Sequence, residues 1–141
     1  MRIEPEEQDF DPDELARRGE GAVLADGAAL FDARRYEEAH EEFEKLWLAN
    51  EAGDADFFKG LIQAAICLHH LQRGNLDGAR KLYSGHRRYL AAYLPSHRGL
   101  DVQAFLAAMQ ACMRPVLRGR PEERFPMDAL TVPRMPLAAT G

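Results

Sequence analysis

Apolar residues recur every three or four positions along most of the chain, which is the spacing of amphipathic helices. No stretch alternates apolar and polar residues in the manner of a half-buried strand. The pattern predicts five helices, which cover residues 11–31, 36–50, 54–73, 76–94 and 101–113. The expected fold class is therefore all-α, a single-domain bundle of about five helices.

Three segments follow from the same pattern. Residues 1–10 are expected to be an acidic flexible lead-in, residues 11–117 the helical bundle domain, and residues 118–141 an extended Pro-rich tail. Because the tail carries apolar residues between its prolines, we expect it to pack on the body. Pro115, near the end of the bundle, is expected to end or kink the last helix.

Capping residues mark the expected helix boundaries. Gly74 suits the left-handed position that ends a helix, and Asn75 and Asp101 suit the positions that begin the next two helices. Asp54 or Asp56 is expected to cap the third helix in the same way.

The second and third helices carry the candidate chemistry. His40 lies within the apolar face of the second helix, and Glu44 lies one turn further on, at the border of that face. The third helix is apolar around more than half of its surface, which predicts a central position, and His69 projects into the middle of that arc. If the two helices form an antiparallel hairpin, His40 lies level with His69, and Trp47 lies level with Ile62.

A histidine and a carboxylate at i and i+4, with a second histidine from a facing helix, can hold a divalent metal ion. The predicted metal ligands are accordingly His40, Glu44 and His69. The same groups suit general acid–base chemistry in a hydrolytic reaction, with Glu44 or His40 as the base. A third interpretation makes both histidines hydrogen-bonded core residues, and the sequence leaves all three open.

A polar stripe crosses the otherwise apolar third helix at Lys59, Gln63 and His70, either as a solvated seam or as the lining of a cleft. Trp47 is likewise either a core residue or part of a pocket wall, because its indole N–H needs a partner. The candidate ligand pocket between the second and third helices is formed by seven residues: His40, Glu41, Glu44, Trp47, Lys59, Gln63 and His69.

The charge of the chain changes sign along its length, although the net charge is -5. Residues 1–56 hold 18 acidic and 6 basic side chains, whereas residues 57–141 hold 5 acidic and 12 basic ones. Such asymmetry favours packing of the two halves against each other. Binding of an anionic polymer through the region from Arg80 to Arg98 is a weaker alternative because the total charge is negative, so no nucleic-acid partner is expected.

The composition, 46% hydrophobic and 29% charged, is that of a globular domain of one core. No apolar run approaches the roughly 20 residues that span a bilayer, and the acidic N-terminal stretch lacks the apolar centre of a secretory signal. No membrane partner is therefore expected. Cys67 and Cys112 fall within predicted helices, so we expect buried free thiols and a cytoplasmic location.

Three motifs along these helices occur in the same order as in a known family. The pattern A-H-E-x-x-E-x-x-W, preceded by an aromatic residue, occupies residues 36–47, and F-x-x-G-L-I-Q-x-A occupies residues 57–65. A histidine follows at position 69 or 70, and G-N-x-x-G-A occupies residues 74–79. Together these motifs resemble the family known as domain of unknown function 309, over roughly residues 28–117.

The resemblance implies a small cytoplasmic helical bundle without an established activity. The family's recurrent polar residues correspond in this chain to His40, Glu41, Glu44, Lys59 or Gln63, and His69. The expected function is thus the binding of a small ligand or a metal ion between the second and third helices. The alternative is a non-catalytic protein-interaction module that uses the acidic N-terminal half or the Pro-rich tail. Enzymatic activity, the identity of the ligand or partner, and the oligomeric state stay open.

Overall fold

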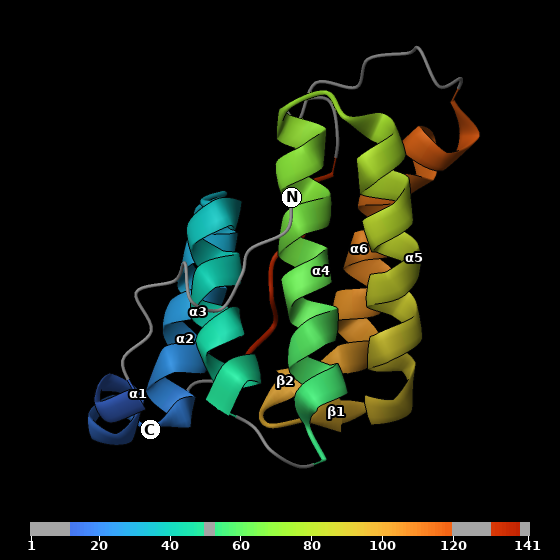
Figure 1. The fold of residues 1–141 in the computed structure, drawn as a ribbon. Helices are drawn as coiled ribbons and strands as arrows, with labels where there is room; N and C mark the ends of the chain where they lie inside the picture. The colour runs from blue at the N-terminus through green and yellow to red at the C-terminus, as the bar shows by residue number, and fades with distance from the viewer. Residues whose placement is uncertain (1–11, 50–52, 120–130, 139–141) are drawn as a thin grey trace.

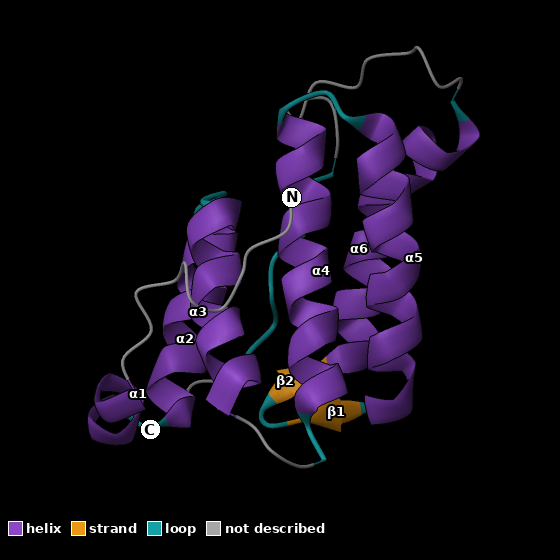
Figure 2. Cartoon of the chain, in the orientation of Figure 1, coloured by secondary structure: helices purple, strands orange, loops and turns teal. Residues whose placement is uncertain are grey.

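The computed structural model describes residues 12–49, 53–119 and 131–138. These residues form an all-α bundle, as predicted (Figure 1; Figure 2). Its elements in chain order are α1 (Pro12–Arg18), α2 (Glu20–Asp32), α3 (Tyr36–Ala49), α4 (Ala55–Gln72), α5 (Leu76–Leu90), the 3-10 turn η2 (Ala91–Tyr93), β1 (Ser96–His97), β2 (Leu100–Asp101) and α6 (Val102–Arg118).

Helices that follow one another in the chain also pack side by side. α2 packs on α3, α3 on α4, α4 on α5, and α5 on α6, so α4 lies in the middle of the bundle (Figure 1). This position agrees with the wide apolar surface predicted for α4, whose buried residues occur on several sides of the helix: Phe57, Phe58, Gly60, Leu61, Ala64, Ala65, Cys67, Leu68 and Leu71. None of the helices in the described ranges is long and apolar enough to cross a membrane.

The first predicted helix is divided in two, a break that the sequence analysis did not predict. Gly19, between α1 and α2, has φ +83°, a left-handed conformation that a continuous right-handed helix does not contain. The segment is therefore broken at a single residue, Gly19. The fourth predicted helix also ends earlier, at Leu90, and tightens into η2.

Of the two effects predicted for Pro115, an end or a kink of the last helix, the end is wrong, because α6 continues through Pro115 to Arg118. Proline lacks the backbone N–H that would donate to the carbonyl four residues earlier in a helix, and its ring crowds that carbonyl, which here belongs to Ala111. Ala111 is exposed, so water can serve its carbonyl, while the neighbouring Met113 and Val116 are fully buried. Burial of the apolar side of this last turn outweighs the lost hydrogen bond.

Two strands of two residues each, β1 and β2, were not predicted. Ser96 pairs with Asp101 and His97 with Leu100, around a turn in which Arg98 and Gly99 both have positive φ. Leu137 forms a bridge to Leu100, which extends this small hairpin. Pairs this short carry too few residues for an alternating pattern, so sequence periodicity misses them.

Three of the predicted caps are confirmed and one is wrong. Gly74 has φ +76°, Asn75 Oδ1 accepts from the Gly78 N–H at 3.0 Å, and Asp101 Oδ1 accepts from the Ala104 N–H at 2.9 Å. Asp54 precedes α4 but makes no capping hydrogen bond. Its carboxylate instead accepts from Arg98 and lies 3.0 Å from His97 Nε2.

Residues 131–138 form an extended segment that runs beside α3 and α4 (Figure 1). The Met135 side chain is only 4% exposed, and its backbone N–H donates to Asp32 Oδ1 at 2.8 Å. At the other end, the Ala138 N–H donates to the Gly99 carbonyl at 2.7 Å. This segment therefore ties α2 to the β-hairpin, whereas the predicted lead-in over residues 1–10 and the tail residues 120–130 lie outside the described ranges.

Candidate functional site

A hollow of about 150 Å³ lies where α3, α4 and α5 meet. Five of the seven residues predicted for the site border it: His40, Glu44, Trp47, Lys59 and Gln63. Three aliphatic residues, Ile62, Ile66 and Leu82, complete its wall. We call this space the small hollow. Trp47 borders it together with Ile62, which is the level that an antiparallel α3–α4 hairpin predicts for the two residues.

His40 and Glu44 form the buried polar centre of the small hollow. His40 Nε2 lies 3.3 Å from Glu44 Oε2, and the two residues are only 3% and 6% exposed. The i, i+4 spacing on α3 places both groups on one face of the helix, at a level where apolar neighbours surround them. An imidazole next to a carboxylate in such surroundings can donate, accept or transfer a proton.

Burial sets the protonation of His40. Loss of hydration lowers the pKa of His40, and nearby His69 acts in the same direction, whereas a hydrogen bond to the Glu37 backbone and the Glu37 charge act against it. The net effect is a lowered pKa, so the ring is neutral at neutral pH. His40 can thus serve as a proton acceptor without first losing a proton.

The polar stripe of α4 borders the small hollow on the side of α5. Lys59 Nζ lies 5.2 Å from the centre of the Tyr89 ring, an attractive cation–π arrangement. The Gln63 side chain packs against Gly85, where the absence of a β-carbon leaves room for its amide. Both residues are half-buried, so the stripe lines a recess between α4 and α5. Trp47 is also half-buried, and it both packs against the core and borders the recess.

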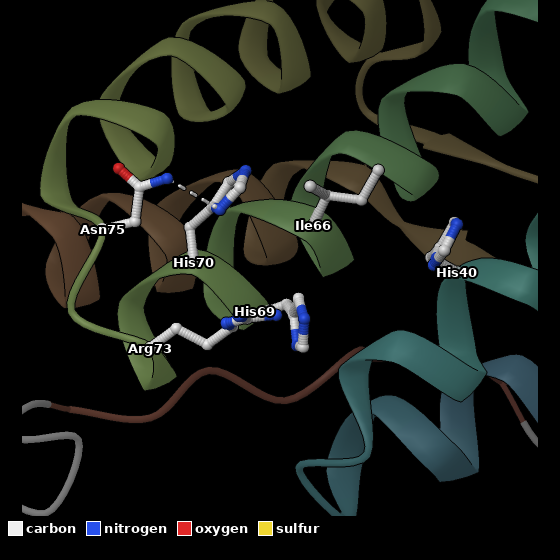
Figure 3. Close-up of a pocket in the computed structure, with 6 residues that line it drawn as sticks. All are labelled: His40, Ile66, His69, His70, Arg73 and Asn75. Carbon is white, nitrogen blue, oxygen red and sulfur yellow. Dashed lines mark hydrogen bonds between the residues drawn. The ribbon is translucent and has the colours of Figure 1, made fainter. Parts of the chain in front are cut away.

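A second hollow, of about 280 Å³, adjoins the first at His40 and Ile66, and we call it the large hollow. Figure 3 shows His40 on α3 facing the residues that α4 contributes, with Asn75 just beyond the end of α4. Among the residues that the structure describes, its lining is His40, Ile66, His69, His70, Arg73 and Asn75. Residues 66, 69, 70 and 73 follow the i, i+3, i+4, i+7 spacing of one helix face.

Asn75 determines which nitrogen of His70 carries the proton. Asn75 Oδ1 accepts from the Gly78 N–H, so its Nδ2 is the atom that faces His70 Nδ1, at 3.2 Å. An amide nitrogen only donates, so His70 Nδ1 is the acceptor and the proton of the neutral ring is on Nε2. Burial, together with His69 and Arg73, also lowers the pKa of His70.

Glu41 does not join the other predicted site residues. It is exposed and lines a third hollow, of about 270 Å³, together with Glu37, Glu38 and His69. Partial burial and the neighbouring charges of Glu37 and Glu38 raise the pKa of Glu41. The prediction that Glu41 and Glu44 share one pocket is therefore not supported, because Glu41 is exposed and lines the third hollow, whereas Glu44 is buried and borders the small hollow.

The predicted metal set is also not assembled. Glu44 borders the small hollow, His69 borders the large hollow, and His40 borders both. Within the described ranges, no three His, Cys, Asp or Glu side chains lie close enough together to hold one metal ion. The predicted pairing of His40 with Glu44 is confirmed, whereas His69 borders a separate recess.

Several residues of the two hollows were not predicted as site residues. They are Ile62, Ile66, His70, Arg73, Asn75 and Leu82. The helical spacing of residues 66, 69, 70 and 73 was a detectable signal, because it places two histidines and an arginine on one face. Leu82 comes from α5, and only the tertiary packing shows that it reaches this recess.

His86 of α5 borders neither hollow. Its Nδ1 lies 3.1 Å from the Gly60 carbonyl, and its ring centre lies 5.3 Å from that of Phe105 on α6. The side chain is fully buried, and burial lowers the pKa of His86 to about 4. His86 is a neutral core residue between α4 and α6.

Comparison with curated proteins gives no match for this chain. The family model described as domain of unknown function (DUF309) matches residues 24–82. The matched stretch includes α3 and α4 whole and reaches Leu82 on α5, so it contains every residue that borders the two hollows. The resemblance to this family that the motifs predict is confirmed over residues 24–82, the stretch that the family model matches.

Proposed function

We propose that this protein binds a small molecule in the small hollow, with an apolar body against Trp47, Ile62 and Leu82 and a polar group directed at the His40–Glu44 pair. One observation supports the proposal: the buried His40–Glu44 pair and several apolar side chains border the same recess. Ligand sites commonly combine a mostly apolar lining with a few placed polar groups.

The size of the recess limits the ligand. A hollow of about 150 Å³ is smaller than the usual range of sites for drug-sized molecules, about 300–1,000 Å³. It suits a body of about one six-membered ring.

We place the protein in the cytoplasm, because Cys67 and Cys112 are both free thiols and neither forms a disulfide.

Fluorescence of Trp47 provides a direct test, because Trp47 is the one tryptophan of the chain. Benzyl alcohol is a suitable probe, since it combines one ring with one hydroxyl group. We expect a saturable change in Trp47 emission with a dissociation constant of about millimolar order, as small fragments give. Replacement Ile62→Phe fills part of the hollow and should abolish the change.

A matched variant controls for general effects of adding a ring. Leu106 is a half-buried leucine of α6 that borders neither hollow, so Leu106→Phe should leave the titration unchanged. Absence of a saturable signal in the wild-type protein, or an equal signal in Ile62→Phe, would contradict the proposal. Either result would favour the alternative of a protein-interaction module.

A further inference from the structure

We infer that the large hollow binds an oxyanion, so that the ligand of this protein carries a phosphate-type head joined to its apolar body. The inference deepens the proposed function and rests on it for the apolar part of the ligand. The two hollows adjoin at His40 and Ile66, so one molecule can occupy both. The head would lie among the side chains of Figure 3 and the body beside Trp47.

The described side chains that line the large hollow carry no negative charge. In the described part of the chain, each polar side chain that borders it is an imidazole, a guanidinium or an amide: His40, His69, His70, Arg73 and Asn75. No carboxylate of the described residues lines this space. Arg73 supplies a permanent positive charge with a planar fork of N–H donors, a geometry that matches phosphate and carboxylate oxygens.

Two of the imidazoles have nitrogen atoms suited to an anionic oxygen. Because Asn75 occupies His70 Nδ1, the proton of the neutral His70 ring is on Nε2 and remains a donor. His69 Nε2 is buried and makes no hydrogen bond within the described part of the chain. A buried polar atom of this kind generally has a partner, and because the His69 side chain lines the large hollow, a turn of its ring would let an oxyanion there supply one.

The end of α4 does not oppose an anion here as strongly as a bare helix C-terminus would. The last carbonyls of a helix carry partial negative charge when they lack partners. In this structure the His69, His70 and Leu71 carbonyls accept hydrogen bonds from the backbone N–H groups of Arg73, Gly74 and Asn75. Gly74 makes this possible through its left-handed conformation.

The five histidines of the full-length chain allow the site to be located by NMR. With ¹⁵N-labelled imidazoles near neutral pH, we expect inorganic phosphate to shift the His69 and His70 signals saturably. His86 and His97 lie outside the large hollow and should not respond. Benzyl phosphate should bind at least about tenfold more tightly than inorganic phosphate or benzyl alcohol, because it fills both hollows.

Charge-matched variants separate this site from general attraction of anions. Arg73→Gln should weaken binding of inorganic phosphate and benzyl phosphate by about tenfold, while benzyl alcohol binding stays unchanged. Arg88→Gln removes the same charge from an exposed position of α5 outside both hollows and should have no effect. Both arginines are exposed, so neither replacement is expected to unfold the protein.

The outcomes distinguish this inference from the proposed function. Binding of benzyl alcohol without binding of either phosphate compound would overturn the oxyanion site and leave the small hollow as a ligand site. Binding of inorganic phosphate at His69 and His70 without benzyl alcohol binding would support the oxyanion site and overturn the apolar one. Equal shifts of all five histidines, or equal weakening by both arginine variants, would overturn the oxyanion site.

Discussion

Gly85 of α5 lies directly against the side-chain amide of Gln63 on α4, and a β-carbon at Gly85 would collide with the Gln63 side-chain oxygen. One turn earlier on α4, Gly60 similarly faces the Leu90 side chain of α5. The two glycines therefore allow α4 and α5 to approach closely. They differ in what they face, the end of a polar side chain in one case and a fully buried leucine in the other.

Alanine at these two glycines should have different effects. A β-carbon at Gly60 would lie 2.7 Å from two Leu90 carbons, so Gly60→Ala should lower the free energy of unfolding by about 1–3 kcal/mol. Gly85→Ala should cost less, because the Gln63 amide can rotate away, but this rotation should weaken benzyl alcohol binding in the small hollow. Urea unfolding and Trp47 fluorescence would check both effects, and a larger stability loss in Gly85→Ala would contradict them.

The His40–Glu44 pair should show energetic coupling. Because both groups are buried, removal of either leaves the other with an incompletely paired polar group, and each alanine variant should lose about 1–3 kcal/mol of stability. The double variant should lose less than the sum of the single losses, by about 0.5 kcal/mol or more.

Urea denaturation of the four proteins in this cycle would measure the coupling. Glu41→Ala removes a carboxylate from an exposed face of the same helix and serves as the control. It should change stability little and show no coupling with His40→Ala. Strictly additive losses for His40 and Glu44 would show that the 3.3 Å approach has no energetic consequence.

His86 should make the protein sensitive to acid. Its pKa is about 4 in the folded protein and 6.5 in an unfolded chain, so the unfolded state binds the proton more tightly. Stability should therefore fall as the pH decreases from about 6.5 to about 4, by an amount on the order of 3 kcal/mol from this group. Below about pH 4 the contribution of His86 to the free energy of unfolding should no longer change with pH.

His86→Asn provides the comparison, because asparagine does not titrate and can place an N–H donor near the position of Nδ1. The variant should be less stable at neutral pH, since it loses the ring that contacts Phe105. Its stability should nevertheless change less steeply between pH 6.5 and pH 4 than that of the wild-type protein. Urea unfolding would measure both stabilities, and an equal dependence of the free energy of unfolding on pH in the two proteins would contradict the assignment of the acid sensitivity to His86.

Asp54 joins three elements and should stabilise the protein above its own titration range. Burial raises the pKa of Asp54, but hydrogen bonds from Arg98 and His97 outweigh this effect and hold the pKa below 3.8. A carboxylate with a lowered folded-state pKa stabilises above the unfolded pKa, and this stability is lost as the pH falls through the folded value.

Asp54→Asn should accordingly lower the thermal midpoint at neutral pH, with a difference from the wild-type protein that shrinks below about pH 3.8. Arg98 also pairs with Glu20 of α2 at 2.6 Å, so loss of Asp54 should loosen the contact of the β-hairpin with α2 as well as with α4. Asp56→Asn, at an exposed position of the same helix, is the control and should change the midpoint little. A constant difference at all pH values would contradict the linkage.

Local sequence signals predicted the bundle well because its main contacts are between helices adjacent in the chain. The predictions that were wrong concern single residues with opposing tendencies. Pro115 should end a helix by its own chemistry, yet burial of Met113 and Val116 keeps the helix intact. Asp54 has the chemistry of a cap, yet Arg98, distant in sequence, provides stronger partners.

The sequence by itself determined the helices, most of their caps and the His40–Glu44 pair, because each depends on residues within a few positions of one another. Only the tertiary structure decided that the site consists of two adjoining hollows, that His69 and Glu41 lie apart from Glu44, and that Leu82 and Asn75 take part. These facts depend on how far α5 lies from α4 and on the side toward which each ring turns. The distance between α4 and α5 is set by residues such as Gly85, which has no side chain, and Leu90, and these residues meet α4 only when the whole bundle packs.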